Sequence, residues 1–72
     1  MSAVSVVEAY LLLPGDGLHT GKGETFDVVR VTAEPHEVRP TVVVIATDPN
    51  GLRRRITFDQ LQLVRYIPGS AR

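Results

Sequence analysis

Three consecutive arginines, Arg53 to Arg55, are the residues of this sequence best suited to bind a charged partner. A guanidinium group stays charged, and its planar fork matches the oxygens of phosphates and carboxylates. Successive side chains of a strand point to opposite faces, so Arg53 and Arg55 share one face and Arg54 lies on the other. Three apolar residues share the face of Arg54: Leu52, Ile56 and Phe58. They mark this face as the inward one, with Arg54 near its rim.

The arginine run allows a functional and a purely structural interpretation, which we weigh equally. Arg53 and Arg55 could recognise the phosphates of a nucleic acid or the carboxylates of a protein. They could equally form a solvated surface that keeps an exposed strand from pairing with other chains. We predict a partner-binding surface that includes Arg53, Arg55, Arg65 and Lys22.

The glycine-rich stretch from Gly15 to Gly23 does not match a phosphate-binding loop. A Walker loop has four residues between its first glycine and the Gly-Lys pair, and Ser or Thr after the lysine. Here Gly17 and Gly21 enclose three residues, and Gly23 follows Lys22. The glycines are better explained by turns that need positive φ angles.

The sequence offers no set of residues that predicts catalysis or metal binding. His19 and His36 are the only histidines, there is no cysteine, and their spacing matches no metal-binding pattern. The serines Ser2, Ser5 and Ser70 lack the context of a nucleophile. We therefore expect neither an enzyme nor a bound metal or cofactor.

Length and charge narrow the classes of protein further. Seventy-two residues make one domain, and 8 Lys+Arg against 8 Asp+Glu give no net charge with neutral histidines. The zero hides two unlike halves: residues 1–38 carry two basic against six acidic residues, and residues 39–72 the reverse. Strong nucleic-acid binders are usually basic overall, so this balance disfavours that class. The opposite halves could also attract a second copy.

The chain is expected to be a soluble, cytoplasmic domain without a membrane segment. The apolar run from Ala3 to Leu13 is interrupted by Ser5 and Glu8, and it is shorter than the roughly 20 residues that span a bilayer. The lack of cysteine fits a cytoplasmic location. Without disulfides, so small a core gains from burial against another copy, which predicts self-association.

Valine-rich segments between regular Gly and Pro turns predict an all-β fold of five or six short antiparallel strands. The turn Asp48-Pro49-Asn50-Gly51 predicts a hairpin, and residues 8–13 suit a strand or a helical turn. A short helical turn is expected at residues 58–61, and a frayed tail at residues 68–72. The predicted strands are residues 4–7, 18–19, 25–33, 41–47, 52–58 and 63–67.

Three segments, Leu13 to Leu18, Phe26 to Val31 and Ile56 to Asp59, resemble the small SH3-like barrel proteins common in actinobacteria and their phages. The resemblance covers most of the chain but rests on strand and turn patterns. It implies an SH3-like β-barrel with one helical turn before the last strand, and a phage or mobile-element origin.

The sequence as a whole predicts a non-catalytic binding module. Its partner is expected to be another protein, including a second copy of itself. The alternative is a nucleic-acid-binding small barrel that uses the Arg53 to Arg55 hairpin.

Overall fold

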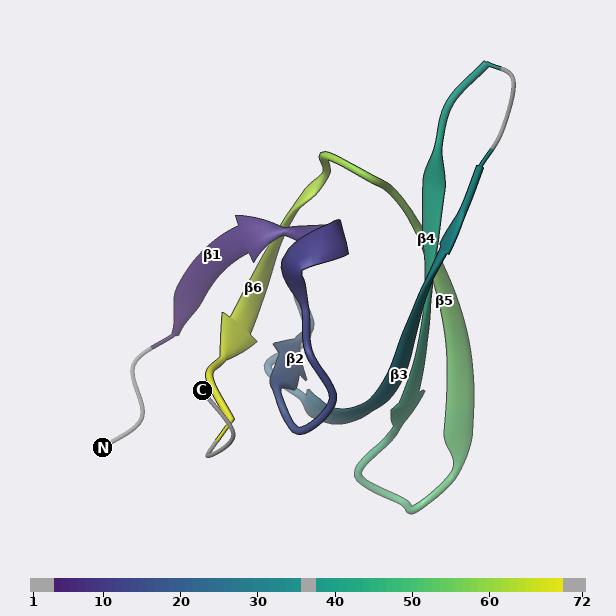
Figure 1. Ribbon diagram of the computed structural model, residues 1–72. Coiled ribbons are helices and arrows are strands. Elements are labelled where there is room, and N and C mark those ends of the chain that lie inside the picture. Colours follow the sequence, from purple (N-terminus) through teal and green to yellow (C-terminus); the bar gives the residue numbers. More distant parts are fainter. Residues whose placement is uncertain (1–3, 36–37, 70–72) are drawn as a thin grey trace.

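The computed structural model describes residues 4–35 and 38–69 and shows an all-β protein. Six antiparallel strands form one open sheet in the order β1-β6-β2-β3-β4-β5 (Figure 1). No ladder joins β1 to β5 among these residues, so both strands are edges of the sheet. The strands are β1 (Ser5–Glu8), β2 (Gly17–His19), β3 (Thr25–Glu34), β4 (Thr41–Thr47), β5 (Arg53–Asp59) and β6 (Leu63–Ile67).

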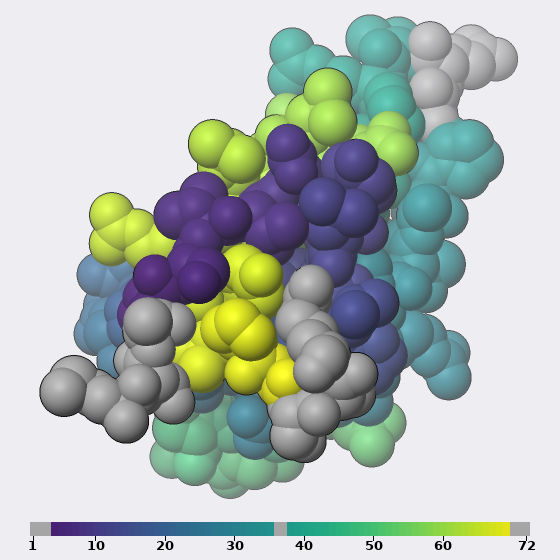
Figure 2. Space-filling model, turned by 60° about the vertical axis from the view of Figure 1, so that its left-hand side comes forward, coloured from purple at the N-terminus to yellow at the C-terminus, as the bar shows by residue number. Residues whose placement is uncertain are grey.

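The predicted strands are therefore confirmed, with boundaries that differ by a residue or so. Figure 1 shows β3, β4 and β5 on one side of the molecule, opposite β1 and β6. Figure 2 views it from the side of β1 (purple), which lies against β6 (yellow) and pairs with it. No helix of the described segments is long and apolar enough to cross a membrane.

The apolar side chains of the central strands explain why the sheet encloses a core. β4 lies between β3 and β5 in the sheet, and every second side chain of part of this strand is fully buried: Val42, Val44 and Ala46. β-branched side chains suit such a strand because they pack well on a pleated surface. Other strands and the 3-10 helix complete the core with Ala9, Leu12, Leu18, Val28, Val64 and Tyr66.

The helical turn lies elsewhere than the sequence predicts. The prediction for residues 58–61 was wrong, because Phe58 and Asp59 extend β5 opposite Val42 and Thr41. Gln60 and Leu61 then form a tight turn that the Gln62 N–H closes on the Asp59 carbonyl, at 3.0 Å.

The one helical element of the described residues, a 3-10 helix (η1, Ala9–Leu11), follows β1 and resolves the ambiguity at residues 8–13. The Tyr10 N–H donates to the Gln60 carbonyl and thereby holds η1 against the turn after β5.

Buried Asp16 connects the loop before β2 to the end of the chain. Its Oδ2 accepts the Leu13 N–H, and its Oδ1 accepts the Gly69 N–H, both at 2.9 Å. The carboxylate thus replaces water for two backbone donors. Pro68 and Gly69 belong to the predicted tail, yet Gly69 is held in place; residues 70–72 of that tail lie outside the described residues.

Candidate functional site

A tight turn sets the start and the register of β5. The Gly51 N–H donates to the Asp48 carbonyl at 2.9 Å, and the Asp48 N–H donates to the Leu52 carbonyl at 2.8 Å. Pro49 fixes the φ angle that the turn needs, and Gly51 adopts φ 85°, which a side chain would disfavour. The predicted hairpin at residues 48–51 is confirmed, and it delivers Arg53 to Arg55 onto an edge strand.

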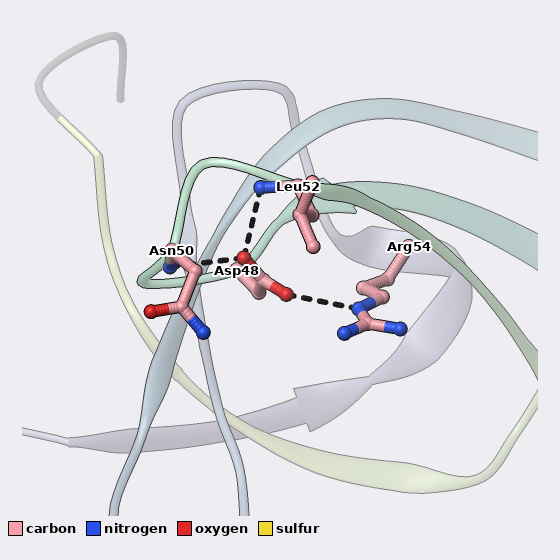
Figure 3. A network of polar contacts seen from close by, with 4 residues as sticks. All are labelled: Asp48, Asn50, Leu52 and Arg54. Carbon is pink, nitrogen blue, oxygen red and sulfur yellow. Dashed lines mark hydrogen bonds and ion pairs between the residues drawn. The ribbon is translucent and has the colours of Figure 1, made fainter.

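Buried Asp48 holds this hairpin together (Figure 3). Its Oδ1 accepts the backbone N–H groups of Asn50 and Leu52, each at 2.9 Å, and its Oδ2 accepts Arg54 Nε at 2.9 Å. Backbone donation from Leu52 is the main cause that lowers the pKa of Asp48 below its ordinary value of 3.8; burial opposes it, and Arg54 and Asn50 add to it. Arg54 is thus anchored to the hairpin and differs in its contacts from Arg53 and Arg55.

The outer backbone edge of β5 is free of strand partners among the described residues. Two hydrogen bonds show which residues of β5 direct their backbone groups toward β4. At one end the Asp48 N–H donates to the Leu52 carbonyl, and at the other the Gln60 N–H donates to the Pro40 carbonyl at 3.1 Å. In an antiparallel pair such bonded positions alternate with positions whose backbone groups point away. The residues that point their N–H and carbonyl groups away from β4 are therefore Arg53, Arg55, Thr57 and Asp59.

The same alternation sends the side chains of Arg53 and Arg55 to the solvent side of the sheet. Both are exposed. Arg55 NH2 lies 3.5 Å from Glu34 Oε1, but both side chains are more than half exposed, so this ion pair contributes about 1 kcal/mol at most. Arg53 makes no ion pair within residues 4–35 and 38–69. Both guanidinium groups are thus accessible to a partner.

A β-bulge adds a third arginine to this surface. The register between β3 and β4 shifts after Val28, so that Val29 is the extra residue and Arg30 lies opposite Ile45. Ile45 in turn pairs with Arg55, which places Arg30 and Arg55 two strands apart, about 10 Å, in one row. We call Arg30, Arg53 and Arg55 the arginine face. Sequence reasoning missed Arg30, because only the bulge turns it outward.

The four predicted partner-binding residues do not form one surface. Arg53 and Arg55 lie together on β5, whereas Arg65 is exposed on β6, opposite His19 of β2 in the sheet. Lys22 lies in the turn between β2 and β3. The structure therefore brings together only the first two.

A groove of about 480 Å³ lies where β5 passes β2 and β6. Phe58 and Ile56 line it from β5, opposite Leu18, Leu63 and Arg65. Within it, His19 Nδ1 is buried and has no hydrogen-bond partner among the described residues. Ile56 and Phe58, the inward side chains of β5 that line the groove, are partly buried against the core.

The described segments hold no group of three His, Asp or Glu side chains placed to bind a metal ion. His19 lies in β2 and His36 lies outside the described residues, so their separation is not defined. Compared with known proteins, the chain matches no family model, and no curated protein matches it.

Proposed function

We propose that the protein is a non-catalytic binding module that recruits a protein partner by adding a strand of that partner to β5. The free outer edge of β5 is the observation that carries the proposal. An unpaired edge offers N–H and carbonyl groups at the spacing of an extended chain, and many interaction domains bind peptides in this way. The inward side chains Ile56 and Phe58 offer apolar contacts to alternate residues of such a strand.

The arginine face favours a partner strand that carries a carboxylate. Arg53 and Arg55 flank the free backbone groups on the solvent side, and Arg30 extends the positive charge across the sheet. Arginine binds carboxylates through two parallel hydrogen bonds, which adds specificity to the strand pairing. The partner's strand would then place a carboxylate opposite an arginine on the solvent side and an apolar residue on the inner side.

Acidic side chains among the arginines favour a protein over a nucleic acid. Asp27 shares a cross-strand row with Arg53 through Thr47, and Glu34 lies beside Arg55. These carboxylates would repel a phosphate backbone, whereas a protein partner can place a complementary charge opposite each acidic and basic side chain. Nucleic-acid binding through residues 53–55 remains the alternative.

The proposal includes an SH3-like barrel of the kind found in actinobacterial and phage proteins, located in the cytoplasm. Its support is the number and length of the antiparallel strands in one sheet, together with the resemblance of the three sequence segments. The cysteine-free composition supports the location.

Capture of partners from native lysate tests this proposal. Replacing Arg53 and Arg55 together by Ala is expected to reduce capture several-fold while changing stability by no more than about 0.5 kcal/mol, because both side chains are exposed. Replacing Lys22 by Ala removes an exposed positive charge in the turn between β2 and β3, outside the groove, and serves as the control, with capture unchanged. A partner that disappears after nuclease treatment would instead establish the nucleic-acid alternative. Equal capture by the Arg53/Arg55 double variant and by Lys22→Ala would exclude the arginine face.

A further inference from the structure

We infer that β5 binds a second copy of the same chain, as an antiparallel β5–β5 pair whose two-fold axis passes through Ile56. The inference rests on the proposed function, since it names the partner of the same edge. A two-fold interface presents one surface twice, so the surface must be complementary to itself. The residues of β5 meet this condition in one register.

Full overlap of β5 (Arg53–Asp59) with its antiparallel copy centres the pairing on Ile56. Arg53 then lies opposite Asp59 of the second copy, and this happens twice because of the symmetry. Arg55 lies opposite Thr57 in the same way. Arg53 therefore gains an opposite charge, and Arg55 faces a neutral hydroxyl, so that no arginine lies directly opposite another.

The backbone agrees with this register. Arg53, Arg55, Thr57 and Asp59 are the residues whose backbone groups point away from β4. In the Ile56-centred pairing each of them lies opposite another residue of this set. Donors and acceptors therefore meet along the whole edge, and the sheets of the two copies become continuous.

The neighbouring registers that also align these backbone groups are less favourable. Moving the two-fold axis from Ile56 to Arg55 places Arg55 opposite Arg55 of the second copy, where like charges repel. A shift the other way places Thr57 opposite its own copy and Arg55 opposite Asp59, but it carries Arg53 beyond the end of the strand and shortens the pairing. Repulsion between like charges thus disfavours the first shift, and the shorter pairing disfavours the second.

The inner face also gains from this pairing. Ile56 is half-buried at the edge of the sheet and would contact Ile56 of the second copy across the axis. Phe58, which lines the groove, would lie opposite Arg54 of the second copy, whose aliphatic stem can cover the ring. Asp59 already lies 3.4 Å from Arg39, but both side chains are more than half exposed and this contact competes weakly.

Sedimentation of the full chain over a concentration series tests the inference. We expect a dimer with a dissociation constant on the order of micromolar, because a single strand pair buries less than a standard interface. Arg53→Asp places carboxylates opposite each other and is expected to weaken the dimer about tenfold or more. Asp59→Arg is expected to do the same, and the two changes combined restore the wild-type constant.

Lys22→Asp is the matched control, since it reverses one exposed positive charge in the turn between β2 and β3, outside the groove, and is expected to leave the dimer unchanged. Circular dichroism of each variant confirms that the monomer remains folded. A chain that stays monomeric, or a dimer that Arg53→Asp leaves intact or that the combined change does not restore, would overturn the inference. A monomeric chain whose partner capture is still lost in the Arg53/Arg55 double variant would overturn the second copy as partner and leave the strand-addition site standing.

Discussion

Replacing Asp48 by Ala is expected to lower Tm by about 10 °C or more, the largest loss of stability that we predict for a single polar side chain. The carboxylate is buried and accepts two backbone N–H groups and Arg54 Nε. Alanine would remove the one side chain that joins these three donors and so leave the turn without its central acceptor. Thermal unfolding followed by circular dichroism measures the loss.

The pH dependence of stability provides an independent check on Asp48. Its pKa is lowered in the folded protein, first by the Leu52 N–H, so its contribution is present above the unfolded pKa, near 3.8. That contribution is lost as the pH falls through the lower folded pKa. Asp48→Asn is therefore expected to be less stable than wild type at neutral pH and to lose less stability on acidification.

Asp59→Asn is the matched control, because Asp59 is an exposed carboxylate at the other end of β5. In dilute monomer, where the proposed β5–β5 contact is absent, it is expected to change Tm little. If Asp48→Asn and Asp59→Asn have the same stability at every pH, the network in Figure 3 does not hold the hairpin.

Proline scanning of β5 should separate the free edge from the paired edge. The Thr57 N–H points away from β4, so Thr57→Pro removes no ladder hydrogen bond, and edge strands tolerate such prolines. We expect this variant to remain folded and to lose partner binding about tenfold or more, because the ring blocks an added strand. Binding and circular dichroism are measured on the same sample.

Ile56→Pro is the counterpart at the neighbouring position. The Ile56 N–H faces Val44, so proline removes a ladder bond together with a half-buried side chain. We expect it to unfold the domain. If Thr57→Pro unfolds the protein as completely as Ile56→Pro does, the assignment of outward backbone groups on β5 is wrong.

Much of the fold could be predicted because its signals are local. The Asp48-Pro49-Asn50-Gly51 turn carries a residue suited to each position, and valine-rich segments between glycines and prolines predict strands. The alternation along β5 then correctly places Ile56 and Phe58 toward the core. These features depend on near neighbours in the chain.

The features that sequence reasoning missed depend on contacts between distant segments. The bulge at Val29 arises from the pairing of β3 with β4, and without it Arg30 would share the inward face of Val28. Phe58 and Asp59 stay extended because β4 pairs with them, although their sequence also suits a helical turn. The Asp48 carboxylate was the one missed feature with a local signal, since Asp at the first position of a turn commonly binds the backbone two residues on.

Amide hydrogen exchange along β5 tests the central claim, that its outer edge is a free site for strand addition, most directly. In dilute monomer we predict rapid exchange at Arg53, Arg55 and Thr57, and slow exchange at Arg54 and Ile56. Once the protein associates, with itself or with a captured partner, the three rapid amides should become protected. Protection of all five amides already in the dilute monomer, or three amides that stay unprotected in the associated protein, would contradict the account.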